Sequence, residues 1–157
     1  MKHLIISVAA ASLLSFSAMA QATNDESDGV KQTINNLFSA MLGADSSALR
    51  MCFDSVAIMQ TVRQTEGQGA SVAGTSSPDR FIAQIGAAKP GALDERIVFE
   101  KILIDGPMAV AWTPYKFYLN GQFSHCGVNV FQLVRKTDGW KIVSVLDTRR
   151  KEGCSPD

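Results

Sequence analysis

The chain of 157 residues is 46% hydrophobic and 19% charged, and its 15 basic and 15 acidic residues leave no formal net charge. That length fits one domain with its own core. Nucleic acid is not expected as a partner, because phosphate binding requires clustered basic residues that this composition lacks.

The first twenty residues have the pattern of a secretory signal peptide. Lys2 and His3 precede an apolar run, and Ala18-Met19-Ala20 supplies the small-x-small pattern that signal peptidase recognises. The run is too short for stable membrane insertion, although an uncleaved anchor is the alternative. We therefore expect removal of residues 1–20 by cleavage after Ala20, and a periplasmic or secreted protein.

Three cysteines remain after this cleavage, and two of them are expected to pair in an oxidising compartment. Cys52 lies between apolar residues, where a free buried thiol is common, so the expected bridge is Cys126–Cys154. No bridge at all is the alternative. Cys126 is not expected to act as a nucleophile with His125, because neighbours in a strand point to opposite faces.

The N-terminal half of the exported chain is predicted to be mainly helical. Residues 21–29 are polar and acidic and are expected to be flexible. From Val30 to Gly43 the apolar residues recur at helical spacing. Asp45 or Ser46 can cap a second short helix, because either side-chain oxygen can accept a first-turn amide.

A strand, a loop and a third helix are expected next. The strand covers Val56–Val62, and Gln64–Ser76 is rich in Gly, Ser, Thr and Ala, which predicts a mobile loop. That loop is either an ordinary surface loop or a lid. Ser77-Pro78-Asp79 has the pattern of a helix start, and Lys89-Pro90-Gly91 ends the helix.

The rest of the chain is predicted to form a β-meander. Its strands are expected at Arg96–Asp105, Met108–Leu119, Gln122–Lys136 and Trp140–Arg149. Asn120-Gly121 and Asp138-Gly139 suit the hairpin turns, since these residues accept positive φ. Helices followed by such a run indicate an α+β fold. We expect a cone-shaped, strongly curved antiparallel sheet packed on about three N-terminal helices, with an interior pocket.

The element order and the series Tyr115…His125-Cys126-Gly127…Gly139-Trp140…Asp147 resemble the nuclear transport factor 2-like superfamily. Within it, the chain is similar to the exported bacterial branch labelled lumazine-binding or SnoaL-like. The resemblance covers about Val30 to Arg149, which implies a domain over residues 30–150 and a C-terminal tail over residues 151–157. It also implies a pocket and a homodimer. The superfamily includes isomerases, dehydratases and cyclases, but their catalytic residues have no matching motif here.

His125 is the first candidate for acid–base chemistry, because it titrates near neutral pH. It is the only histidine outside the signal peptide, which excludes a multi-histidine metal site. Asp147 and Arg149 share one face of the last strand and could orient His125 or hold an anionic ligand. A structural histidine and a structural ion pair are the alternatives. The Tyr115 hydroxyl could donate to a ligand carbonyl.

The aromatic residues Trp112 and Phe131 are expected in the pocket wall, with Asn129 beside His125 on the same strand face. No cofactor and no metal are expected. A regular Asn120-Gly121 hairpin places Trp112 opposite Asn129, but a bulge at Pro114 would change this pairing.

The register of the last hairpin decides where Asp147 points. A three-residue turn with a bulge at Gly139 pairs Lys136 with Trp140 and places Asn129 opposite Asp147. A two-residue turn built on Asp138-Gly139 shifts the pairing by one and sends Asp147 to the other face. The sequence leaves both registers open.

Three functions remain open from the sequence. The first is an exported binding domain whose aromatic-lined cavity holds a small, partly polar organic molecule. The second is a cofactor-independent isomerase or lyase (a dehydratase or cyclase) that uses His125 with Asp147 and Tyr115. The third is a dimeric interaction domain without chemistry.

Overall fold

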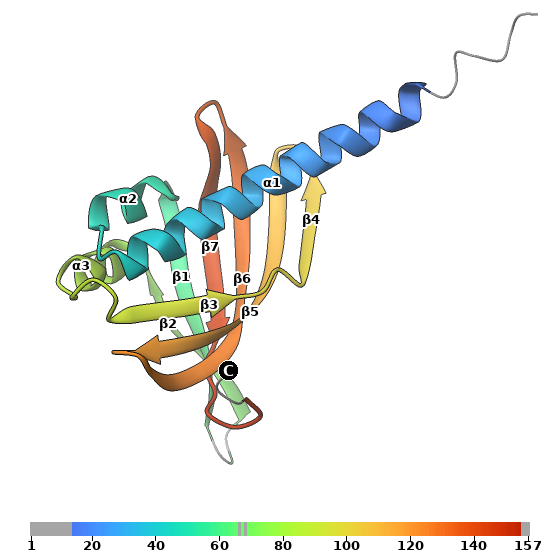
Figure 1. The fold of residues 1–157 in the computed structure, drawn as a ribbon. Coiled ribbons are helices and arrows are strands. Elements are labelled where there is room, and N and C mark those ends of the chain that lie inside the picture. Colours follow the sequence, from blue (N-terminus) through green and yellow to red (C-terminus); the bar gives the residue numbers. More distant parts are fainter. Residues whose placement is uncertain (1–13, 66, 68, 155–157) are drawn as a thin grey trace, which may run out of the picture.

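The computed structural model describes residues 14–65, 67 and 69–154 (Figure 1). Three helices and seven strands make up this part of the chain. The helices are α1 (Leu14–Leu42), α2 (Ser46–Met51) and α3 (Asp79–Gly86). The strands are β1 (Phe53–Thr65), β2 (Gly69–Ser76), β3 (Leu93–Ile97), β4 (Lys101–Asp105), β5 (Met108–Leu119), β6 (Gln122–Lys136) and β7 (Gly139–Thr148).

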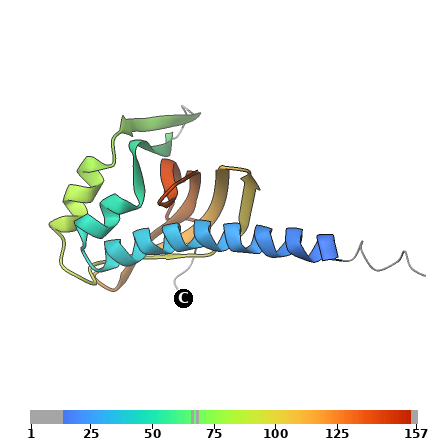
Figure 2. The ribbon, with the colours of Figure 1, turned by 90° about the horizontal axis from the view of Figure 1, so that it is seen from above.

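The seven strands form one curled sheet in the order β2-β1-β7-β6-β5-β3, and β4 pairs with the other half of β5. All neighbouring strands are antiparallel except β1 and β7, which are parallel. Seen from above, α1 runs along one side of the curled sheet, and α2 and α3 lie at one end of it (Figure 2). The predicted α+β cone is confirmed, with the parallel pair as a difference.

The core lies between α1 and the concave face of the sheet. Val30 and Ile34 of α1 are completely buried, and Phe131 and Leu133 of β6 meet them from the sheet side. The ring of Phe38 packs edge-on against Phe131, with centroids 6.0 Å apart. Burial of each such side chain contributes about 1.5–3 kcal/mol, so this layer is a main source of fold stability.

Helix α1 begins earlier than the sequence predicts. Residues 21–29, expected to be flexible, are helical. Contacts with the β6–β7 hairpin explain the difference: Arg135 pairs with Glu26, and an added Cβ on Gly29 would lie 2.9 Å from the Trp140 ring. The expected cleavage point after Ala20 falls within α1, and residues 1–13 lie outside the described residues, so cleavage stays a prediction.

The segment predicted as a loop, Gln64–Ser76, is instead part of a β-hairpin. Strand β1 continues to Thr65, and β2 pairs with it from Gly69 to Ser76. Small residues suffice here, because an edge strand is held by its backbone ladder and β2 needs no large buried side chain. The prediction of a mobile loop was therefore wrong.

The single strand predicted over Arg96–Asp105 is two strands. Strand β3 begins earlier, at Leu93, and pairs with the end of β5, whereas β4 pairs with its start. Between them, the Val98 amide donates to the Pro114 carbonyl (2.9 Å) and the Glu100 amide to the Trp112 carbonyl (3.2 Å). These two bonds bend the chain around β5, so two short strands cover the edge of one long strand.

The two remaining helix starts agree with the sequence. Asp45 caps α2, since its side chain accepts from the amides of Ser47 and Ala48 at 3.0 and 2.9 Å. At α3 the Ser77 hydroxyl accepts from the amide of Asp79 at 3.2 Å. Both side chains satisfy amides that the helix itself leaves unpaired.

A bulge in β7 sets the register of the last hairpin. The turn has two residues, Thr137 and Asp138, between the paired Lys136 and Gly139, so it is not built on Asp138-Gly139 as expected. By itself this pairing would send Asp147 outward. Val143 is then an extra residue in β7, because Gln132 pairs with Ser144 and Leu133 with Ile142. Asn129 consequently lies opposite Asp147, as in the bulged register, but the bulge is at Val143 and not at Gly139.

A second bulge lies in the first hairpin. Leu119 pairs with Gln122 across the Asn120-Gly121 turn, and Ser124 is then an extra residue in β6. Thr113, and not Trp112, therefore lies opposite Asn129. Pro114 pairs with Val128 without a bulge, so the expected irregularity is at Ser124.

The cysteines pair as predicted. Cys126 and Cys154 form a disulfide with Cα atoms 6.2 Å apart, and Cys52 is free and buried. Backbone bonds of 3.0 and 2.9 Å also join Cys126 and Arg150. The disulfide and these bonds fix the chain beyond β7 against β6. No helix in the described part of the chain is both long and apolar enough to cross a membrane.

Candidate functional site

A pocket of about 220 Å³ lies between the concave face of the sheet, helices α1 and α3, and the β1–β2 hairpin. Helix α1 contributes only apolar side chains to it, whereas the sheet and α3 contribute both apolar and polar ones. The apolar lining includes Leu37, Phe38, Met41, Met59, Phe81, Phe131 and Val145; the polar lining includes Thr61, Arg80, Gln84, Glu95, Asn129, Asp147 and Arg149. Such a division suits a molecule with an apolar body and a polar end.

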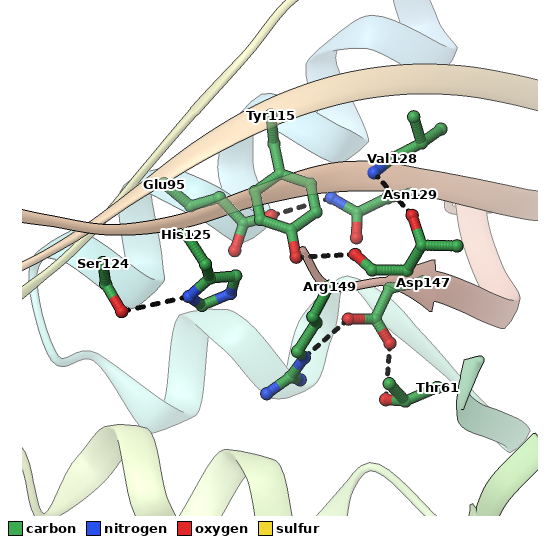
Figure 3. A network of polar contacts seen from close by, with 10 residues as sticks. Thr61, Glu95, Tyr115, Ser124, His125, Val128, Asn129, Asp147 and Arg149 are labelled. Atoms are coloured by element: carbon green, nitrogen blue, oxygen red, sulfur yellow. Dashed lines mark hydrogen bonds and ion pairs between the residues drawn. The ribbon is translucent and has the colours of Figure 1, made fainter. Parts of the chain in front are cut away.

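Glu95 of β3 is the most perturbed carboxyl group of this pocket. Its Oε1 accepts a hydrogen bond of 2.7 Å from the Asn129 side-chain amide (Figure 3). The pKa of Glu95 is raised to about 7, chiefly by burial and in smaller part by the nearby charge of Asp147, against the lowering effects of the Asn129 bond and of Arg149. At neutral pH this carboxyl group therefore exists in both protonation states.

Asp147 is held in place by two side chains. Its Oδ1 accepts from the Thr61 hydroxyl at 2.5 Å, and its Oδ2 from Arg149 Nε at 2.8 Å. The Asp147 side chain is only 12% exposed, whereas that of Arg149 is 61% exposed. The Asp147 carboxylate is therefore the buried member of this ion pair, and the Arg149 guanidinium group is the solvent-exposed member.

Tyr115 has its hydroxyl engaged by the backbone. It donates to the Thr148 carbonyl at 2.9 Å, and burial raises the Tyr115 pKa well above its ordinary value. Gly127 makes this contact possible, because an added Cβ there would lie 1.9 Å from the Thr148 oxygen and 2.6 Å from the Tyr115 ring. Tyr115 thus links β5 to the end of β7.

His125 packs between aromatic rings. Its ring centroid is 5.7 Å from that of Tyr115 and 5.0 Å from that of Phe117, and its Nδ1 lies 3.1 Å from the Ser124 hydroxyl. Burial lowers the pKa of His125, and the charge of Arg149 lowers it further. No hydrogen bond among the residues of Figure 3 joins His125 to Asp147 or Tyr115.

Comparison with solved structures identifies the fold. An NTF2-like protein with a cystatin-like fold from Novosphingobium aromaticivorans has a TM-score of 0.67 at 14% identity, covering 93% of this chain and 95% of that one. NTF2-like proteins of unknown function from Shewanella baltica (TM-score 0.64, 16% identity, 82% and 96% coverage) and Silicibacter pomeroyi (TM-score 0.61, 20% identity, 82% and 98% coverage) are also similar. The chain has the nuclear transport factor 2-like fold.

These likenesses establish the NTF2-like fold and no reaction. No family model matches the sequence, and no curated protein matches it significantly. Placement in the exported lumazine-binding or SnoaL-like branch stays a prediction. The roles of individual residues must therefore come from the geometry of this NTF2-like domain itself.

The pocket unites part of the predicted site. Asn129, Phe131, Asp147 and Arg149 line it. Trp112 does not: it lies on the opposite, outer face and is 46% exposed, because the Ser124 bulge shifts its pairing by one residue. His125 and Tyr115 share the inner face but are not among the lining residues.

Sequence reasoning missed Glu95, Thr61 and Arg80. Glu95 had a detectable signal, since it stands between the apolar residues Leu93 and Ile97 at alternate positions, which places a carboxyl group on the inner face of a strand. Within the described residues, no group of three or more His, Cys, Asp and Glu side chains could hold a metal ion.

Proposed function

We propose that this NTF2-like domain binds a small organic molecule with an apolar body and a polar end. The observation that carries the proposal is a pocket lined by both apolar side chains and fixed polar groups. The polar groups are held by hydrogen bonds between Glu95 and Asn129 and among Thr61, Asp147 and Arg149. Prearranged polar groups fix the orientation of a ligand, and the apolar surface supplies most of its burial.

Native mass spectrometry of the protein purified without denaturation tests this proposal. We expect a carried molecule that is lost in Ala73→Trp, because Ala73 lines the pocket from strand β2 and the indole would fill it. Ser71→Trp is the matched control: it adds the same side chain two residues away, on the same strand face and outside the lining. The same carried mass in Ala73→Trp, or none in the unsubstituted protein, would contradict the proposal.

A cofactor-independent isomerase or lyase is the second candidate, favoured by the contrast between the two carboxyl groups. Glu95 titrates near pH 7, whereas Asp147 accepts bonds through both oxygens. Carboxyl groups with such different surroundings can divide proton transfer and charge stabilisation between them. The geometry supports Glu95 as the proton carrier in place of His125, whose ring is held among aromatic side chains outside the pocket.

The enzyme candidate has its own test. In deuterium oxide, a carried or added carbonyl compound should exchange the hydrogen beside its carbonyl in the presence of the protein, because ionised Glu95 can accept that proton and return a deuteron. Glu95→Gln should abolish the exchange and Glu100→Gln, at an exposed surface position, should not. Equal exchange in both variants would exclude Glu95 as the proton carrier.

We also propose that the domain forms a homodimer through the outer face of its sheet. Large apolar side chains are exposed there: Leu103 at 57%, Met108 at 52% and Trp112 at 46%. Val110, Val128 and Val130 extend this face between them. Monomeric proteins rarely expose such a contiguous patch, and a stable dimer needs about 800 Å² on each partner.

Light scattering tests the dimer. On a size-exclusion column with light-scattering detection, the unsubstituted protein should have the mass of a dimer and Trp112→Glu that of a monomer. Val72→Glu is the control and should remain dimeric, because Val72 is exposed on the distant edge strand β2. A monomeric unsubstituted protein would contradict the proposal.

Export with cleavage after Ala20 remains part of the proposal. The Cys126–Cys154 disulfide supports it, because such bonds persist in oxidising compartments. N-terminal sequencing of the exported protein should begin at Gln21.

A further inference from the structure

The pocket lining contains four ionisable side chains, two of which form an ion pair with each other. Asp147 and Arg149 pair with each other at 2.8 Å, and Glu95 carries only part of a negative charge at neutral pH. Arg80 is the fourth, and it makes no hydrogen bond or ion pair with any other described residue. Among the described residues, Arg80 is therefore the one pocket cation without a partner of opposite charge.

Arg80 lies in the first turn of α3, on the side of the helix that faces the pocket. Phe81 and Gln84 line the pocket from the same helix, whereas Ile82 and Ile85 are buried in the core. The neighbouring carboxylate, Asp79, does not neutralise Arg80, because it pairs with Arg50 at 2.8 Å and accepts from Ser77 at 2.6 Å.

The exposure of the two guanidinium groups defines the outer end of the pocket. Arg80 is exposed and Arg149 is 61% exposed, whereas the carboxylate of Asp147 is only 12% exposed. An anion is repelled by the carboxyl groups at the inner end, Glu95 and Asp147, and attracted by the guanidinium groups at the outer end. The inner end of the pocket is thus the negative end, and the outer end is the positive end.

We infer that the ligand is an apolar organic acid whose carboxylate binds Arg80 at the outer end of the pocket. The inference rests on the proposed binding function and adds the chemical class of the ligand. A guanidinium group binds a carboxylate through two parallel hydrogen bonds, which a neutral amide cannot reproduce. The apolar body lies against Phe38, Phe81 and Phe131, and the other end of the ligand is uncharged where it meets Glu95.

Calorimetric titration with three probes of one shape tests the inference at pH 7 on the oxidised protein. The probes are 1-naphthoate, 1-naphthamide and 1-naphthylmethylamine, which carry a negative, a neutral and a positive polar group on the same ring system. We expect 1-naphthoate to bind at least about tenfold more tightly than 1-naphthamide. 1-Naphthylmethylamine should bind more weakly still.

Substitution of the arginine separates charge recognition from cavity binding. Arg80→Gln should weaken 1-naphthoate binding by about tenfold, to the level of 1-naphthamide, and leave 1-naphthamide binding unchanged. Arg63→Gln is the control, because Arg63 is also exposed but lies in β1 outside the pocket lining. A melting curve confirms that each variant is folded.

The outcomes distinguish the two claims. Equal binding of 1-naphthoate and 1-naphthamide, tighter binding of the amine, or an Arg80→Gln variant that still prefers 1-naphthoate would overturn the ligand class and leave the binding pocket standing. Binding that persists in Ala73→Trp, or no binding of any probe, would overturn the pocket proposal together with the inference.

Discussion

Replacing Glu95 with Gln should make the domain more stable at alkaline pH and leave it almost unchanged at acid pH. The Glu95 pKa is raised from 4.5 to about 7 in the folded protein, chiefly by burial. Below pH 4.5 the carboxyl group is protonated in both the folded and the unfolded chain. Between pH 4.5 and 7 the unfolded chain releases the proton and the folded chain keeps it, so the free energy of unfolding falls as the pH rises.

The size of this effect follows from the pKa difference. One pKa unit corresponds to about 1.36 kcal/mol, so the shift from 4.5 to about 7 costs the folded state about 3 kcal/mol once the pH exceeds 7. Glu95→Gln removes this cost, because glutamine does not ionise and its oxygen can still accept from Asn129. The stability gain should therefore grow from near zero at pH 4.5 to about 3 kcal/mol at pH 8.

Urea unfolding of the oxidised protein at half-unit steps between pH 4.5 and 8.5 measures the effect. The quantity of interest is the difference in unfolding free energy between Glu95→Gln and the unsubstituted protein, since other titrating groups cancel in it. Glu100→Gln is the matched control, because Glu100 lies at the exposed break between β3 and β4. Its difference from the unsubstituted protein should be constant with pH.

A pH-independent difference for Glu95→Gln would refute the reasoning that burial keeps this carboxyl group protonated. A difference of the opposite sign, with the variant losing stability as the pH rises, would show that the Asn129 bond to the ionised form outweighs burial. Either result would also weaken Glu95 as a proton carrier near neutral pH.

Three further predictions concern the residues around the pocket. Burial lowers the pKa of His125, so the folded chain binds a proton at this residue less readily than the unfolded chain, and the free energy of unfolding should fall as the pH drops below about 6.5. In the same urea measurements, His125→Gln should remove that part of the pH dependence. Gly127→Ala should cost more than about 4 kcal/mol, because the new methyl group would lie 1.9 Å from the Thr148 carbonyl, and a normal melting curve would contradict this clash. Cys154→Ser should lower stability by about 3 kcal/mol through loss of the bridge to Cys126, and adding reductant to the unsubstituted protein should reproduce the loss.

The meander was predictable because its signals are local. Asn120-Gly121 marks one turn, and the strands on either side have the residues that strands prefer, so β5 and β6 begin and end where the sequence predicts. The disulfide followed from the apolar surroundings of Cys52. These features need no knowledge of what packs against them.

The remaining features depend on contacts between distant segments. Residues 21–29 are helical where they meet Trp140 and Arg135, which lie more than 100 residues away. The β1–β2 hairpin is held by backbone pairing that small side chains do not reveal. Glu95 was missed because the strand was expected to start at Arg96, three residues after its actual start at Leu93. Trp112 was misplaced because no residue type indicates the bulge at Ser124.

The bulge at Val143 bears on which changes in chain length this domain can tolerate. Deleting Val143 would make the β6–β7 pairing regular and leave every later pair unchanged, so Asp147 would still lie opposite Asn129 on the inner face. An added residue between Val143 and Asp147 has no such unpaired position to replace, and in a regular ladder it would turn Asp147 to the outer face. A one-residue deletion at the bulge should therefore preserve ligand binding, whereas a one-residue insertion in the same part of β7 should abolish it while leaving a paired sheet.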